Sequence, residues 1–371
     1  MVNKKTKILF LTQTNEHGAA SRYRVYQYLE YLRSSGFIPV VSSGLPGFLF
    51  GFFYKRSNIL KKLICLPLII IKRIADLSRV RKFDIVFIQR DIIPHCYPLF
   101  EMLISRMNKN IVFDFDDAIF TANPENSRFL KKIRYKKAVE RIIKKSRAVI
   151  AGNDFLRQYA LKFNKNVYLL PTSVDTQRWN SKTEYPDRKE GLIIGWIGQE
   201  YTLFYLDFLK PVFKRLSSEF DFCLHIVGAG FDYGIEGVRI KNISWDYSSE
   251  VDLVREFDVG VAPLSDDEWA RGKCGLKALL YMACGVPCVC SDAGVFKDII
   301  TDNSDGFLAA GQEQWYEKIA SLLKNKELRM RIGKGAVCTV REKYSVQKNR
   351  EKLKDIIESI QINKNLTGKR R

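Results

Sequence analysis

The chain has 371 residues, of which 46% are hydrophobic and 27% are charged, and its formal net charge is +20. This length exceeds what one hydrophobic core usually serves, so it predicts two domains, and the composition is that of an ordinary globular protein and not of a disordered one. The eight cysteines show no regular spacing and the start shows no signal-peptide pattern, so we expect reduced thiols and a cytosolic protein.

Apolar runs and helical patterns alternate in the first half of the chain, as parallel α/β sheets require. Strands are predicted at 8–12, 39–42, 85–89, 111–115 and 148–152, with a helix over 21–33 and a long insertion over 43–80. Pro171 and Thr172 mark the end of this domain, which we predict to span residues 1–172.

The positive charge is concentrated in this first domain. Residues 1–172 carry 31 Lys and Arg against 12 Asp and Glu, a balance of +19, whereas the remainder carries 30 against 29. The densest stretches are 55–82, with nine basic residues and one acid, and 128–147, with ten and one. Two such stretches favour a polyanionic partner, although solvated helix faces are the alternative reading of each.

The first basic stretch is interleaved with bulky apolar side chains, a combination typical of interfacial amphipathic segments. These side chains are Phe48, Leu49, Phe50, Phe52, Phe53, Tyr54, Leu60, Leu63 and Ile64. The longest apolar run, 63–71, contains Pro67 and is too short to span a bilayer. No helix-turn-helix, zinc-finger or RNA-platform pattern supports nucleic acid, so we expect segment 46–82 to face an anionic membrane surface.

The α/β pattern restarts after the polar stretch 180–190. Strands are predicted at 192–196, 223–227, 259–262 and 287–290, and helices at 203–216, 248–257 and 276–283. We predict this second domain over 173–343, followed over 344–371 by a C-terminal helix that ends near residue 360 and a tail that frays from residue 363. Two consecutive doubly wound α/β domains predict ligand binding in a cleft between them.

Segment 269–287 carries the strongest binding signal. It reads as a loop and a helix, with Gly285 as C-cap and Pro287 as stop. Gly272 and Gly275 allow close approach to the helix start, where free amides and the helix dipole attract anions. Three cations flank the same point: Arg271, Lys273 and Lys277. We therefore expect a diphosphate to bind here.

Short motifs continue along the second half, at 153–155, 170–175, 195–198, 225–230, 258–264, 275–276, 282–287, 291–294 and 305–308. In combination they resemble the donor-site signature of glycosyltransferase family 4. The resemblance implies a GT-B fold, retaining and metal-independent transfer, a nucleotide-sugar donor on the second domain, an acceptor on the first, and no cofactor. The donor-binding residues expected on this basis are Gly198, Gly228, Arg271, Lys273, Gly275, Leu276 and Lys277.

The sequence departs from the family pattern in two places. Glutamates usually stand at two positions that, aligned on 282–287, correspond here to Gly272 and Leu280. The Arg and Lys that usually follow the first strand of the second domain are replaced by Gln-Glu-Tyr-Thr at 199–202. We expect the three cations at 271, 273 and 277 to take over diphosphate binding.

In the first domain, Gly18, Arg22 and Arg24 follow the first predicted strand and open a helix. Ligands of open α/β sheets bind at the carboxyl ends of strands, and helix starts suit anions. We expect these residues to bind the acceptor pyrophosphate, or a donor phosphate across the cleft. Ordinary surface arginines are the alternative.

Asp114, Asp116 and Asp117 stand together at the end of another predicted strand. Carboxylates this close repel, which raises a pKa unless cations or hydrogen bonds compensate. An Asp-x-Asp pair can hold a divalent metal, but such sites belong to a different, single-domain architecture. We expect Asp116 or Asp117 to be catalytic, by orienting the acceptor hydroxyl or stabilising positive charge at the anomeric carbon. A structural helix N-cap is the alternative.

The resemblance implies a retaining glycosyltransferase, and the charge of the first domain predicts that it is peripheral on the inner face of the membrane. It would move sugar from a nucleotide-sugar to a membrane-associated saccharide or polyprenyl-diphosphate-linked acceptor, in surface polysaccharide biosynthesis. Loss of the family glutamates also allows a catalytically silent nucleotide-sugar-binding scaffold or partner subunit. A sugar-nucleotide epimerase and a nucleic-acid-binding protein are further alternatives. Among the histidines we expect His95 to line the cleft and His225 to be structural, and the cysteine spacing disfavours zinc.

Overall fold

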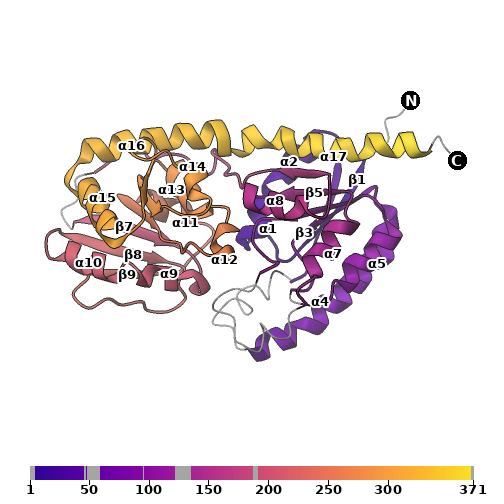
Figure 1. Cartoon of the computed structure of the whole chain (residues 1–371), viewed down its shortest axis with the longest axis horizontal. Coiled ribbons are helices and arrows are strands. Elements are labelled where there is room, and N and C mark those ends of the chain that lie inside the picture. The colour runs from indigo at the N-terminus through magenta and orange to yellow at the C-terminus, as the bar shows by residue number, and fades with distance from the viewer. Residues whose placement is uncertain are drawn as a thin grey trace. The chain divides into compact units, whose positions relative to one another are not determined.

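The computed structural model describes residues 5–45, 47, 59–94, 96–121, 135–186 and 191–368, with the backbone alone for 59–64 and 361–368. The chain forms two α/β units (Figure 1). Unit 1 consists of Met1–Thr172, Gly272–Cys274 and Asn349–Arg371, and unit 2 of Ser173–Arg271 and Gly275–Lys348. The apolar residues expected at 48–54 and the cleft residue His95 lie outside the described residues.

Unit 1 is built on a six-stranded parallel sheet with the strand order β2-β1-β3-β4-β5-β6. Its strands are β1 (Lys7–Thr12), β2 (Ile38–Ser43), β3 (Ile85–Gln89), β4 (Ile111–Phe115), β5 (Ala148–Ala151) and β6 (Val167–Leu169). All residues of β3, β4 and β5 are buried, because strands inside a parallel sheet are covered on both faces. The five predicted strands are confirmed. The edge strand β6 was not predicted, because three half-buried residues carry no periodicity.

The prediction of one continuous helix over 21–33 is wrong. It is divided into α1 (Ala19–Arg24), a 3-10 turn (Tyr26–Tyr28) and α2 (Leu29–Ser34). The break falls at Val25, which is buried and has φ −130° and ψ −62°. Val and Tyr are weak helix formers, so packing of this segment outweighs its helical periodicity.

Among the described residues, unit 1 also contains the helices α4 (Ile59–Arg79), α5 (Leu99–Met107), α7 (Ala138–Lys145) and α8 (Asp154–Leu161). The predicted long insertion therefore contains a 21-residue helix, α4, with Pro67 inside it. Within the described part of the chain, no helix combines the length and apolar character needed to span a bilayer.

Unit 2 has a second six-stranded parallel sheet, with the order β12-β11-β10-β7-β8-β9. Its strands are β7 (Leu192–Ile197), β8 (Phe222–Val227), β9 (Ile240–Ile243), β10 (Val259–Ala262), β11 (Cys288–Ser291) and β12 (Phe307–Ala309). The four predicted strands are confirmed, and His225 is buried within β8. Both edge strands, β9 and β12, were not predicted.

The helices of unit 2 are α9 (Phe204–Asp207), α10 (Lys210–Ser217), α11 (Glu250–Arg255), α12 (Glu268–Arg271), α13 (Leu276–Ala283), α14 (Phe296–Ile299), α15 (Gln312–Lys324) and α16 (Lys326–Thr339). The predicted helix over 203–216 is split before α10. Pro211 lies in the first turn of α10, where a backbone N–H has no intrahelical acceptor, so its missing N–H costs no hydrogen bond. Its ring would clash with the preceding turn, so one helix does not continue through this position.

The last helix, α17 (Val346–Gly368), runs further than predicted. We expected it to end near residue 360 and the tail from 363 to fray, and the tail expectation is wrong as far as Gly368. Residues from Asn349 onward group with unit 1, where the Arg350 guanidinium lies 4.7 Å from the ring centroid of Tyr31 on α2.

Glu101, in the first turn of α5, is a buried carboxyl group in unit 1. Its side chain is 3% exposed, and its Oε1 accepts a hydrogen bond of 2.7 Å from the backbone N–H of Ile92. Burial raises the pKa of Glu101 to about 7, more than the Ile92 hydrogen bond lowers it. The folded protein therefore binds this proton more tightly than the unfolded chain does.

We predict that Glu101→Gln stabilises the protein at pH 8 but not at pH 4.5. The pKa of Glu101 is higher in the folded protein than in the unfolded chain, so its protonated form contributes fully to folding stability below the unfolded pKa. This contribution is lost as the pH rises to about 7. Glutamine keeps an acceptor for the Ile92 N–H without the charge. Denaturant unfolding should show a gain of roughly 1–3 kcal/mol at pH 8. An equal gain at both pH values would contradict this explanation.

Candidate functional site

Charged and polar residues of unit 1 gather where its strands end. Arg90 follows β3, Asp116 follows β4, and Asn153 stands two residues after β5. These strands are parallel neighbours in the sheet, so their carboxyl ends share one edge. In open α/β sheets that edge is where ligands bind.

A buried ion pair supports this edge. The Arg24 guanidinium donates to the Asp114 carboxylate, with 3.1 Å between Nε and Oδ2, and to the carbonyl of Leu170 at 2.8 Å. Both side chains are at most 1% exposed. Burial alone would lower the pKa of Arg24, but the charge and hydrogen bonds of Asp114, together with the charge of Asp116, outweigh it and raise that pKa. Arg24, predicted to bind the acceptor, thus has its charge engaged inside the unit.

Arg90 and Lys273 face the two predicted catalytic carboxylates. Arg90 Nε lies 2.5 Å from Asp116 Oδ1, and Arg90 NH2 lies 3.6 Å from Asp117 Oδ2. Lys273 Nζ lies 2.9 and 3.1 Å from the two oxygens of Asp117. Burial raises the pKa of Asp116, but Arg90, with smaller contributions from Arg24 and Lys273, lowers it by more, so this carboxylate is ionised at neutral pH. Compensating cations therefore offset the repulsion expected among these acids.

The backbone of Arg90 is in the left-handed region, with φ +59°. Non-glycine residues adopt it rarely, and such strain is concentrated at functional sites. Its N–H donates to the carbonyl of Asp114 at 2.7 Å, which holds the residue beside β4. Our sequence reasoning missed Arg90, and only its place directly after a strand could have indicated it.

The turn Gly272–Cys274 groups with unit 1, and its contacts explain one missing family glutamate. A Cβ on Gly272 would lie 2.3 Å from the Cβ of Ala118, so no side chain fits at this position. The Lys273 carbonyl accepts from Asn153 Nδ2 at 2.9 Å, and Cys274 is buried against Gly152. These contacts place the Lys273 ammonium beside Asp117.

Asp117 Oδ1 also accepts a hydrogen bond of 3.1 Å from the N–H of Ala118, but the described residues 118–121 form no helix that this carboxylate could cap. Within the described residues, no group of three or more His, Cys, Asp or Glu side chains is arranged to hold a metal ion. The carboxylates instead face Arg24, Arg90 and Lys273.

In unit 2, Lys277 lies across the glycine turn that follows β7. Its Nζ is 3.2 Å from Thr202 Oγ1 and 4.2 Å from the ring centroid of Trp196. A Cβ on Gly198 would lie 2.6 Å from the Trp196 ring and 2.9 Å from Lys277 Cε, so only glycine fits there. Lys277 is in the first turn of α13, where backbone amides have no intrahelical acceptor.

Two further glycines shape this part of unit 2. Gly228 has φ +87°, and a Cβ on it would lie 2.5 Å from the carbonyl oxygen of Gly198. Gly275, the N-cap of α13, has φ +69° and packs against Ile299. Backbone amides, glycine turns and the Lys277 ammonium form a site suited to a diphosphate.

The three cations predicted at one point have different partners. Arg271 Nε lies 3.0 Å from Asp266 Oδ1 on the surface of unit 2, Lys273 pairs with Asp117 in unit 1, and Lys277 contacts Thr202. The structure thus assigns Lys277 alone of the three to the glycine turn.

The remaining predicted residues of unit 1 are at the start of α1. Gly18 is packed so closely that a Cβ would lie 1.9 Å from Thr14 Oγ1. Arg22 is 7% exposed, and its guanidinium carbon lies 5.0 Å from the ring centroid of Tyr23. Arg22 is therefore not the ordinary surface arginine that we considered as the alternative.

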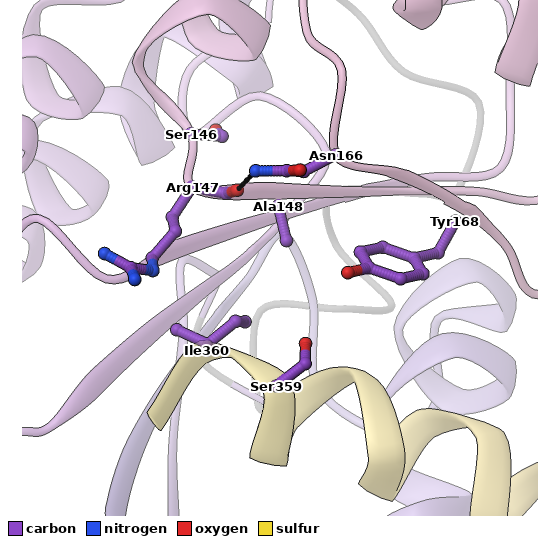
Figure 2. A pocket seen from close by; sticks show the side chains of 7 residues that line it. All are labelled: Ser146, Arg147, Ala148, Asn166, Tyr168, Ser359 and Ile360. Carbon is purple, nitrogen blue, oxygen red and sulfur yellow. Dashed lines mark hydrogen bonds between the residues drawn. The ribbon is translucent and has the colours of Figure 1, made fainter. Parts of the chain in front are cut away.

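Figure 2 shows a polar hollow of about 260 Å³ in unit 1. Its walls include Arg147, whose carbonyl accepts from Asn166 Nδ2 at 3.1 Å, together with Tyr168 and Ser359. The hollow lies where β5 and β6 begin, which is the opposite edge of the sheet from Asp116. We therefore do not assign it to the chemistry.

Comparisons with known proteins agree with the geometry of unit 2. Residues 191–325 match the family described as glycosyl transferases group 1. No curated protein matches the chain in sequence. The predicted resemblance to glycosyltransferases is thus confirmed at the level of this group.

Solved structures show that the fold is GT-B, as predicted. A glycosyltransferase from Rickettsia africae ESF-5 is 17% identical in sequence and has a TM-score of 0.68. The match covers 96% of this chain and 99% of the Rickettsia chain. Anabaena HepE in complex with UDP-glucose is 12% identical, with coverages of 95% and 99% and a TM-score of 0.69. The lipopolysaccharide outer core galactosyltransferase WaaB is 15% identical, with coverages of 95% and 99% and a TM-score of 0.62.

We predict that Asp114→Ala destabilises the protein by about 3–5 kcal/mol, because it leaves the buried Arg24 charge without its carboxylate. Asp154→Ala is the matched control, since Asp154 is 52% exposed and pairs with Arg157 on the surface of the same unit. The control should cost less than about 1 kcal/mol. Urea unfolding of both variants tests this, and equal losses would contradict a supporting role for the buried pair.

Proposed function

We propose that this chain is a retaining, metal-independent glycosyltransferase that uses a nucleotide-sugar as donor and needs no cofactor. The observation that carries the proposal is the site in unit 2, where Lys277, Gly198 and the first turn of α13 come together. The match to glycosyl transferases group 1 covers all three. A relative of the same fold binds UDP-glucose, which supports a nucleoside diphosphate sugar as the donor.

We propose a membrane-associated saccharide or a polyprenyl-diphosphate-linked saccharide as the acceptor, in surface polysaccharide biosynthesis. The +19 balance of residues 1–172 supports an anionic membrane surface as partner, on the cytoplasmic side. WaaB, which has the same fold, is a galactosyltransferase of the lipopolysaccharide outer core. This likeness supports a membrane-associated saccharide as the acceptor of this chain.

In the proposed reaction, the nucleoside diphosphate leaves while positive charge develops at the anomeric carbon. The leaving group gains negative charge, so Lys277 and the α13 amides stabilise the transition state more than the ground state. The acceptor hydroxyl gives its proton to the departing phosphate on the same face, which requires no separate general base.

We assign the catalytic carboxylate of unit 1 to Asp116, with Asp117 beside it. The lowered pKa of Asp116 suits a group that stays ionised and stabilises positive charge, and it does not suit a proton donor. Arg90 and Lys273 hold the two carboxylates in place and are positioning residues in this proposal.

A catalytically silent scaffold is the second candidate function, and one observation favours it. Neither family glutamate has a replacement at its own position, because Gly272 has no room for a side chain and Leu280 is 4% exposed. A scaffold of this kind would bind the nucleotide-sugar without releasing nucleoside diphosphate, so turnover distinguishes the two candidates.

We predict that one nucleoside diphosphate and its sugar raise the melting temperature by roughly 5 °C at about 100 times Kd, in EDTA. Lys277→Met should abolish most of this shift, because a charge-assisted contact worth about 1.5–3 kcal/mol is lost. Lys324→Met is the matched control, since Lys324 also lies over an aromatic ring of unit 2, that of Phe220. A full shift in Lys277→Met would contradict the donor site.

We predict that Asp116→Asn lowers kcat by about 100-fold or more while the donor-induced thermal shift stays that of the unchanged protein. The readouts are nucleoside diphosphate release in EDTA and the anomeric configuration of the product by NMR. Asp154→Asn, a surface change in the same unit, should keep full turnover. Normal turnover of Asp116→Asn would overturn its assignment, and an unchanged protein that binds donor without turnover would favour the scaffold.

A further inference from the structure

An apolar groove lies between α4 and α5 of unit 1. It has a volume of about 510 Å³, and its walls include Ile70, Ile74 and Leu77 of α4 and Leu99, Phe100 and Leu103 of α5. Pockets for small molecules have volumes of about 300–1,000 Å³, so the groove is large enough for one ligand molecule. Its hydrocarbon lining selects a ligand that is itself hydrocarbon.

Several residues of the groove leave apolar surface in water. Ile74 is 56% exposed, Leu99 is 54% exposed, and Tyr97, at the rim, is 46% exposed. Apolar surface exposed in this way is unfavourable in water, and a ligand that covers it removes that cost. Contiguous patches of this kind mark binding sites more often than single exposed side chains do.

The rim of the groove meets a cationic surface. Arg141 of α7 donates a hydrogen bond of 3.1 Å to the Tyr97 hydroxyl, and its guanidinium carbon lies 5.2 Å from the Tyr97 ring centroid. Further exposed cations lie on α7 and on the turn before it: Lys136, Lys137 and Lys145, together with Lys144, whose Nζ pairs with Glu140. A hydrocarbon groove beside clustered cations is complementary to a hydrocarbon chain that ends in phosphate.

The groove is also close to the candidate catalytic carboxylate. Ile93 lines it and follows Arg90 by three residues, so their Cα atoms are at most about 11 Å apart. The guanidinium of Arg90 pairs with Asp116. The Ile92 N–H is tied to α5 through Glu101, which fixes the segment between the two.

We infer that this groove holds the isoprenoid chain of a polyprenyl-diphosphate-linked acceptor, with the diphosphate on the cations of α7. The inference rests on the proposed function, because it assumes a lipid-linked acceptor. A single chain of moderate width suits one groove of this volume, whereas a membrane lipid presents two chains. Ile74 and Leu99 then determine acceptor specificity.

The test is binding of geranylgeranyl diphosphate to the full-length chain by calorimetry, below its micelle concentration and without donor. Ile74→Gln and Leu99→Gln each put a neutral polar group into the groove and should weaken binding roughly tenfold or more. Ile71→Gln is the matched control. Ile71 is on the same helix and 63% exposed but does not line the groove, so its variant should bind within about twofold of the unchanged protein.

Three results would overturn the inference. These are no binding of geranylgeranyl diphosphate, equal weakening by Ile71→Gln, or displacement by inorganic diphosphate or by phosphatidylglycerol vesicles at equal phosphate concentration. The donor-induced thermal shift of Ile74→Gln is measured in parallel. If the unchanged protein shows the donor-induced thermal shift but does not bind geranylgeranyl diphosphate, the groove assignment alone is rejected. If it binds geranylgeranyl diphosphate but shows no donor-induced shift, the transferase proposal alone is rejected.

Discussion

The buried ion pair between Arg24 and Asp114 is the constraint on which the rest of unit 1 depends. It joins the end of α1, the end of β4 and, through the Leu170 carbonyl, the segment after β6. Two charges removed from water are costly unless each is fully paired, so these elements have one acceptable arrangement. The Asp114 backbone carries the constraint further, because its carbonyl accepts the Arg90 N–H.

Arg90 transmits this arrangement to the candidate chemistry. Its strained backbone directs the guanidinium toward Asp116 and Asp117, and Lys273 completes the compensation of charge. Carboxylates at a sheet edge usually repel or bind a cation from solution. Here protein cations keep Asp116 ionised and fixed in place, which suits a group that stabilises positive charge in a transition state.

Unit 2 reaches its site by a different means, close packing of glycines. Gly198 and Gly228 leave no space for side chains, so backbone amides line the surface where the first turn of α13 presents Lys277. The same type of packing accounts for the departure from the glycosyltransferase family 4 pattern at Gly272, whose backbone lies against Ala118. The absence of a glutamate at Gly272 therefore has a steric cause. The proposed diphosphate contact is made by a different residue, Lys277.

The sequence alone determined two α/β domains and most of both sheets, and its resemblance to a known family implied the GT-B fold. Strands buried on both faces require unbroken apolar runs, so β3, β4 and β10 were predicted to the residue, whereas the short edge strands β6, β9 and β12 lack that signal. Only the tertiary structure decided which charges meet. Arg271, Lys273 and Lys277 are neighbours in sequence, but successive side chains of a turn point in different directions, and packing directs each to its own partner. Arg90 has no local signal beyond its place directly after β3, because its role comes from β4, a strand that is its neighbour in space and not in sequence.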